Sequence, residues 1–331
     1  MSQNQSNLPA TFAEQIAGVP KALVPATLKA LDRLIGGVVD IPAAWLAQQK
    51  AKIDAQTEAY KDVEAQIAKA AAAQAGASTA IVGRAVDVLV RNAYKKQTNR
   101  EAVGAATLIE LSERPQFGNN SASEPPADEP EEEWLNVFER YAEEASTERM
   151  QKLWGRVLAG EIRSRGSFSM RSLRFLSEFS QSDATLFAWF CENVFAECVP
   201  ISLVRPDEEA DIRDLLSLQA ADLIDGVDGA GLQLSVRFDE HGFGFFREAN
   251  LVLLLSGMPG GSVAIKSYTL TPVGRELIKL LDRDPRRAAR KVAAAIRTPQ
   301  IKAAHLAIPA GPNTLNKIEM LWTEDQPMEA A

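Results

Sequence analysis

The stretch QKLWGRVLAGEIRSRGSFSMRSLRFL, from Gln151 to Leu176, decides how the middle of the chain folds. Its first half places apolar residues three and four positions apart, which is the period of an amphipathic helix. The apolar residues of this helix are Met150, Leu153, Trp154, Val157, Leu158 and Ile162. Gly166 then supplies the left-handed residue that commonly ends a helix, and Ser167 or Ser169 can cap the next one. The stretch therefore predicts two helices joined by a tight corner.

Four arginines surround this corner, and no acid lies between the first and the last of them. Two interpretations are open. Backbone amides at a helix start attract anions, and guanidinium groups would strengthen such a site. Alternatively, the arginines pair with Glu161, Glu178 or an acidic linker of the same chain. The candidate anion-binding residues are Arg163, Arg165, Ser167, Ser169, Arg171 and Arg174.

Residues 134–200 around the corner form a predicted central helical domain, dense in aromatic residues that indicate a tight core. Ser146 is the expected cap of the helix with Trp154, and Ser180 or Ser182 opens a later helix. An acidic, proline-rich linker precedes this domain at 112–133. Its low hydrophobicity and like charges predict a flexible hinge, or else a segment that docks on a basic patch of the same molecule.

Residues 1–111 are predicted to be a long helical region that assembles copies of the chain. Within Ala43–Gln74, residues recur at near-heptad spacing, which favours a helix paired with a helix of the same chain or of a second copy. These residues are Ile53, Tyr60, Val63, Ile67, Ala70 and Gln74. A helix over Ser78–Tyr94 follows, and the polar stretch 95–100 separates it from a helical segment at 101–111.

Leu23–Leu46 is the most apolar segment, but charged residues and prolines interrupt it. No run of eighteen apolar residues occurs, so a helix that spans a membrane is not expected. A helical hairpin that buries its apolar stripe in protein is one interpretation. A helix that lies on a membrane surface is the other.

The C-terminal third mixes helices with strands. A helix at Asp211–Ile224 precedes alternating or apolar segments that start at Leu232, Phe243, Asn250 and Val263, the third of them expected to be central. The helix in LTPVGRELIKLL completes a pattern that resembles a winged-helix module over 201–282. Residues 283–331 are predicted to form a basic helix and a loose tail, in which Leu315, Ile318, Leu321 and Trp322 could dock a short helix. The expected fold class is mainly α with long N-terminal helices, a central helical domain and a C-terminal, winged-helix-like α+β module.

Composition limits the function. The 331 residues carry a net charge of −8, so the whole molecule is not built to coat nucleic acid or an anionic membrane. The first residues, MSQNQSNLPATFAEQ, are polar and do not resemble a secretory leader, which favours the cytoplasm. Cys191 and Cys198 lie seven apart in a helical pattern, too far for a disulfide, and are expected to be small core residues.

No catalytic motif is recognised. The two histidines, His241 and His305, do not belong to a zinc pattern, and the phosphate-binding and nucleophile-elbow glycine patterns are absent from the sequence. Gly166-Ser167-Phe168-Ser169 has no neighbouring base to activate a serine. We therefore expect no enzyme, no cofactor and no metal.

A second basic patch lies on the predicted helix after residue 282. Its candidate nucleic-acid contacts are Arg283, Arg286, Arg287, Arg290 and Lys291. A basic helix beside a winged helix could follow phosphates. The helix before the strands, however, carries Asp211, Asp214 and Asp222 with Arg213 as its one base, which argues against groove binding and favours protein contacts.

The corner also carries a family resemblance. Its motif reads Gln151-x-Leu153-Trp154-x-x-Val157-Leu158-Ala159-Gly160-Glu161-Ile162, then Gly166-Ser167-Phe168-Ser169-x-Arg171-Ser172-Leu173. It resembles the signature of an uncharacterised bacterial family, a domain of unknown function, and weaker likeness extends over most of Leu34–Leu281. Arg165 stands where that family commonly has proline, and Ser172 where it has threonine. The helical layout is similar, more weakly, to the abortive-infection alpha proteins, which implies a role in phage defence or stress.

The sequence thus predicts an oligomeric, non-enzymatic interaction or sensor protein. Its expected partners are other copies of the chain and another protein. Two alternatives stay open: a membrane-surface effector that uses Leu23–Leu46, and a nucleic-acid binder that uses the winged-helix-like domain and the basic helix.

Overall fold

The computed structural model describes residues 18–35, 69, 79–113, 129–204, 209–227, 232–311 and 314–324. The chain divides into two compact units, Met1–Leu173 and Arg174–Ala331. The predicted division at 112–133 does not separate two bodies, because helices from both sides of it pack together in the first unit.

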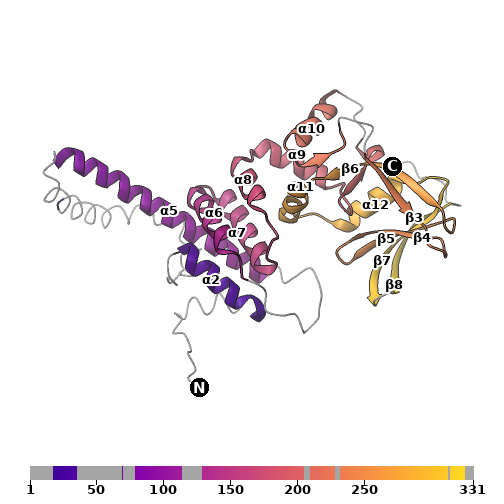
Figure 1. The fold of residues 1–331 in the computed structure, drawn as a ribbon, viewed down its shortest axis with the longest axis horizontal. Coiled ribbons are helices and arrows are strands. Elements are labelled where there is room, and N and C mark those ends of the chain that lie inside the picture. Colours follow the sequence, from indigo (N-terminus) through magenta and orange to yellow (C-terminus); the bar gives the residue numbers. More distant parts are fainter. Residues whose placement is uncertain are drawn as a thin grey trace, which may run out of the picture. The chain divides into compact units, whose positions relative to one another are not determined.

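The first unit is helical. Its elements are η1 (Lys21–Leu23), α2 (Val24–Ile35), α5 (Thr79–Glu113), α6 (Glu132–Glu144), α7 (Glu148–Arg163) and the start of α8 (Met170–Glu178). The C-terminal half of α5 packs against α2, α6 and α7, whereas its N-terminal half extends beyond them (Figure 1). Trp154 is buried between α6 and α7, with its ring stacked on Tyr141 and edge-on to Phe138. The predicted aromatic core is therefore confirmed in this unit.

The polar stretch 95–100 does not separate two helices, because α5 continues through it. It contains no proline or glycine that would end a helix, and its side chains have partners on neighbouring helices. Gln97 Nε2 donates to the carbonyl oxygen of Ile35 at 2.9 Å, and Asn99 Nδ2 donates to that of Glu143 at 2.6 Å. These bonds satisfy carbonyl groups at the C-terminal ends of α2 and α6, which have no partner within their own helices.

Helix α2 buries its apolar face within the protein. Ala30, Leu31, Leu34 and Ile35 are all at most 4% exposed. Residues 36–46 of the predicted hairpin and all six residues of the predicted heptad stripe within Ala43–Gln74 lie outside the described residues. Among the residues described, no helix combines enough length with enough apolar character to cross a bilayer.

The acidic linker is partly described. Helix α5 extends to Glu113 and α6 begins at Glu132, while 114–128 lie outside the described residues. Glu129 pairs with Lys29, and Glu131 pairs with Arg165. The end of the linker thus follows the alternative interpretation, in which its acids dock on basic residues of the same molecule.

The second unit combines helices with two antiparallel four-stranded sheets. Its helices are α9 (Gln181–Cys191), η2 (Ile201–Leu203), α10 (Glu209–Ala220), α11 (Pro272–Leu277), η3 (Ile278–Leu280) and α12 (Pro285–Ala295). Its strands are β1 (Cys198–Pro200), β2 (Ile224–Asp225), β3 (Leu232–Arg237), β4 (Phe243–Glu248), β5 (Leu251–Gly257), β6 (Ser262–Leu270), β7 (Ile301–Gly311) and β8 (Thr314–Thr323). In the first sheet β6 pairs with β1, β2 and β3; the second has the order β4-β5-β7-β8 (Figure 1).

Helix α12 packs on one face of the second sheet. Leu253 and Leu306, which are neighbours on β5 and β7, belong to the same buried cluster as Val292 of α12. Trp322 Nε1 of β8 donates to the carbonyl oxygen of Ala293 at 2.9 Å. We call this side of the β4-β5-β7-β8 sheet its inner face.

The predicted strands are confirmed as β3 to β6, and β5 lies inside its sheet between β4 and β7. The predicted helix at Asp211–Ile224 ends earlier, at Ala220, and Ile224 begins β2. The basic helix is α12. The prediction of a loose tail with a short helix is wrong, because β7 and β8 form two strands of the second sheet. The alanines of 301–311 favour a helix locally. These residues form β7 instead, because pairing with β5 satisfies the backbone hydrogen-bonding groups of β5.

The two cysteines do not share a helix face as predicted. Cys191 is the last residue of α9, and Cys198 begins β1 after a turn in which Ala196 and Glu197 have positive φ. Both thiols are buried, as expected of core residues. Burial raises the pKa of the Cys198 thiol to about 12, so it stays protonated and unreactive at neutral pH.

Candidate functional site

The corner between α7 and α8 has the local structure that the sequence predicts, with one correction. Gly166 adopts φ +80° after the end of α7. Ser169 Oγ accepts from the amide of Ser172 at 3.3 Å and so caps α8. At the other end of α7 the cap is Thr147 and not Ser146, because Thr147 Oγ1 accepts from the amide of Met150 at 3.3 Å. The capping geometry needs a hydroxyl three residues before that amide.

An internal carboxylate occupies the backbone amides of this corner. Glu161 is only 2% exposed. Its carboxylate accepts from the amide of Gly166 at 2.6 Å and from the amide of Phe168 at 3.1 Å. At this turn a carboxylate of the chain itself therefore accepts from backbone amides that one of the two interpretations assigned to an external anion. A glutamate five residues before a left-handed glycine was the available signal, and sequence reasoning missed this role.

Arg163, Arg165 and Arg174 each contact an acid of the same chain. Arg163 Nη2 donates to the carbonyl oxygen of Glu110 at 2.5 Å, and its Nη1 lies 3.6 Å from the carboxylate of that residue. Arg165 pairs with Glu131 of the linker. The Arg174 and Glu178 side chains, more than 70% exposed, approach to 3.6 Å within α8. Binding of an external anion at this corner stays a prediction.

The remaining motif residues build the same turn. Phe168 is 2% exposed, and its carbonyl oxygen accepts from Trp134 Nε1 at 2.7 Å. A Cβ atom on Gly160 would lie 2.6 Å from the Phe168 ring, so only glycine fits there without a shift. Ser167 Oγ donates to the carbonyl oxygen of Ser164 at 2.6 Å. The motif thus forms a corner that is anchored by the buried Glu161 and Phe168, and its serines serve as turn and cap residues.

The second basic patch does not present one continuous surface. Arg283 donates to the carbonyl oxygen of Val194 and pairs with Glu248, and its side chain is only 13% exposed. Arg290 lies 2.8 Å from Glu319. Lys291 Nζ donates to Asn193 Oδ1 at 2.8 Å. Arg286 and Arg287 are exposed on α12. Nucleic-acid binding through these five residues stays a prediction.

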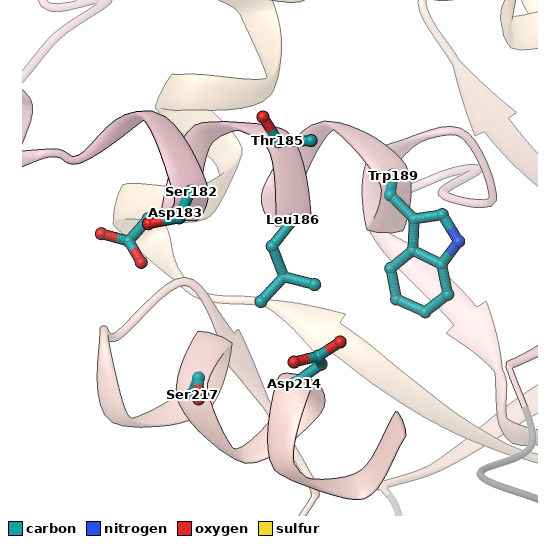
Figure 2. Close-up of a pocket in the computed structure, with 7 residues that line it drawn as sticks. All are labelled: Ser182, Asp183, Thr185, Leu186, Trp189, Asp214 and Ser217. Carbon is teal, nitrogen blue, oxygen red and sulfur yellow. The ribbon is translucent and has the colours of Figure 1, made fainter. Parts of the chain in front are cut away.

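A cleft opens between α9 and α10 in the second unit. Figure 2 shows Leu186 of α9 pointing towards α10, with Asp214 opposite and Trp189 at one end. The acid Asp183 at its rim belongs to a capping box with Ser180, which confirms Ser180 as the cap of α9. Within the described residues, no three His, Cys, Asp or Glu side chains gather as a metal site would require.

An acid at the end of α6 faces the bases of α5. Lys96 Nζ lies 2.6 Å from Glu143, and Arg100 pairs with the other oxygen of the same carboxylate. Burial raises the pKa of Glu143, but the hydrogen bonds from Lys96 and Arg100 outweigh burial, so its pKa lies below the ordinary value. The packing of α5 against α6 is therefore stabilised in part by the negative charge of Glu143, which protonation at low pH removes.

We expect Glu143→Gln to lower the free energy of unfolding by about 1 kcal/mol at pH 7, because charged hydrogen bonds are weakened. A lowered folded pKa means that the charged form contributes stability above the unfolded pKa, and that this is lost as pH falls through the folded pKa. The difference between wild type and variant in urea denaturation should shrink below about pH 4.5. A difference that stays constant down to pH 3 would contradict this role of the charge.

No curated protein and no solved structure matches the chain. The corner motif, on which the resemblance to an uncharacterised family rests, lies within the region that a family model matches. Residues 84–197, from α5 to the turn before β1, match the model of a family described as a protein of unknown function, DUF2806.

Proposed function

We propose that this protein is an oligomeric interaction protein that assembles through the N-terminal half of α5. An apolar stripe on that half carries the proposal. Ile81, Val88 and Leu89 are 60%, 55% and 68% exposed. Their spacing of seven and eight residues places them on one side of the helix, together with Ala85. Exposed apolar stripes of this kind mark contact sites in soluble proteins.

The expected occupant is a second copy of the chain. Val86, on another side of the same helical turns, is only 7% exposed. The stripe with Ile81, Val88 and Leu89 is therefore the exposed apolar side of this half of α5. Two copies related by a twofold axis would bring identical stripes together, which is the commonest way in which a protein buries such a face.

Assembly through α5 would bring copies of the second unit together. We retain the proposal that its α10, β3 to β6 and α11 act as a winged-helix-like module for protein contacts. The weaker similarity to abortive-infection alpha proteins suggests antiphage defence or stress as the setting, by analogy only.

Light scattering after size exclusion tests this assembly. The wild-type chain should have a molar mass of at least twice the 36.0 kDa of one copy. The triple variant Ile81→Gln, Val88→Gln, Leu89→Gln should elute as a monomer, because glutamine keeps the helix but removes the apolar stripe.

The matched control replaces two exposed apolar residues of α10. Ile212 and Leu216 are 42% and 41% exposed, so Ile212→Gln with Leu216→Gln removes exposed apolar surface from a different helix by the same kind of substitution. This control should keep the wild-type mass. A wild-type monomer at every concentration, or loss of assembly in the control alone, would refute the proposal.

A further inference from the structure

The face of the β4-β5-β7-β8 sheet opposite α12, which we call the outer face, has an unusual composition. Residues directly opposite each other in an antiparallel ladder point to the same side. Because Leu253, Leu306 and Trp322 point to the inner face, their neighbours along each strand point outward. The pairings between the strands give three outward rows: Phe243, Ser256, Ala303 and Thr323; Phe245, Leu254, His305 and Met320; Arg247, Val252, Ala307 and Lys317.

Large apolar side chains are exposed on this outer face. Phe245 is 61% exposed, Met320 is 56% exposed and Phe243 is 37% exposed. The two phenylalanines alternate with glycines in Gly242-Phe243-Gly244-Phe245. Gly244 is required there because a Cβ atom would lie 2.7 Å from Val236 on the inner side. The strand thus presents two aromatic rings, two residues apart, to solvent. Exposed apolar side chains that are grouped in this way mark a binding surface.

The charge of the outer face is positive. Its three rows contain Arg247 and Lys317 and no acid, although the chain as a whole carries a net charge of −8. Lys317 Nζ lies 5.5 Å from the centroid of the Phe243 ring, so a cation and an aromatic ring adjoin across the face. In the middle row, burial lowers the pKa of His305, with Lys317 acting in the same direction, so its ring is neutral at pH 7.

We propose that this outer face binds single-stranded RNA. Unpaired bases of any sequence can stack on exposed aromatic rings, because every base has a π-face. The phosphates between the bases interact favourably with lysine and arginine. The alternation of glycine and phenylalanine matches the aromatic strand of RNA-binding sheets. Here that strand lies at the sheet edge, so the likeness concerns the surface and not the fold. RNA is chosen over DNA because unpaired bases are common in RNA loops.

Fluorescence anisotropy of a labelled twelve-nucleotide oligouridylate, titrated with the full chain at low salt, tests the proposal. The wild-type chain should bind saturably. Phe245→Ala should weaken binding about tenfold or more, since one stacked base is lost. Phe245→Leu should weaken it similarly and Phe245→Tyr should not, because the ring and not apolarity is required. Lys317→Ala should weaken binding and reduce the slope of affinity against salt by about one ion.

The control Arg140→Ala with Arg149→Ala removes two exposed cations from α6 and α7 of the first unit, which contribute nothing to the outer face. It should leave RNA binding within about twofold of wild type, apart from a small general charge effect. Absence of saturable binding, equal loss in the control, or unchanged affinity of Phe245→Ala would overturn the proposal. Tighter binding of a duplex or of the matching DNA strand would overturn the choice of single-stranded RNA. Retention of affinity in Phe245→Leu would show that RNA binding does not require the aromatic ring, and would overturn the argument from base stacking.

Discussion

Glu161→Gln should lower the free energy of unfolding by about 2–3 kcal/mol, although the side chain keeps its size. The carboxylate of Glu161 accepts from two backbone amides, those of Gly166 and Phe168, and is almost fully buried. An amide side chain has one acceptor oxygen, and its NH2 group would face a backbone N–H. One buried donor is then left without an acceptor, which costs more than the loss of an exposed bond. Urea denaturation followed by tryptophan fluorescence measures the change, since Trp134 and Trp154 lie in the same unit.

The control for this substitution lies on the same helix. Glu148 is paired with Lys152 at 2.7 Å, but both side chains are about 70% exposed. Glu148→Gln should therefore change the free energy of unfolding little, because water screens an exposed ion pair. Hydrogen exchange should locate the effect of Glu161→Gln at the amides of the corner, in particular those of Gly166 and Phe168. A loss below 1 kcal/mol, or equal losses at Glu161 and Glu148, would mean that the corner does not depend on the internal carboxylate.

Helical period and caps predicted much of the fold. The helix of Trp154, the left-handed Gly166 and the cap at Ser180 follow from local rules, and the structure confirms them. Four strands were also predicted, because alternation and an apolar run are local signals. The hairpin of β7 and β8 was not, because its strand character comes from pairing with β5 rather than from its own residues. A partner distant in sequence overrode a local preference there.

In the candidate sites, too, local sequence predicted some features, whereas others depended on residues that folding brings together from distant parts of the chain. Arginines around a glycine indicated a charged corner, but the identity of the anion depended on which acids folding brings near. Glu110 of α5 and Glu131 of the linker reach Arg163 and Arg165 from far along the chain. Likewise, the sequence showed Phe243 and Phe245 as alternating strand residues. Their place on an exposed face that also carries Lys317 depends on the order of the strands.

Gly155→Ala should lower the free energy of unfolding by about 2–3 kcal/mol, although alanine favours helices more than glycine does. A Cβ atom at Gly155 of α7 would lie 2.6 Å from the Cβ atom of Ala106 and 2.9 Å from its backbone carbon on α5. Neither contact involves a flexible side chain, so relief requires one helix to move. Because α5 and α7 form the main helix pair of the first unit, that movement disturbs the packing around the buried Trp154. Urea denaturation of the full chain gives the magnitude.

The same substitution at Gly83 should have the opposite sign. Gly83 lies in the interior of α5, and a Cβ atom there would have nothing within 4 Å. Gly83→Ala should therefore stabilise the helix by about 0.5–1 kcal/mol, because alanine restricts the unfolded chain and meets no obstacle. The chemical change is identical at the two positions. A higher free energy of unfolding for Gly83→Ala together with a lower one for Gly155→Ala would therefore separate the effect of helix propensity from the effect of packing. Stabilisation at both glycines would mean that α7 does not approach α5 as closely as the structure places it, and the packing around Trp154 would then need another origin.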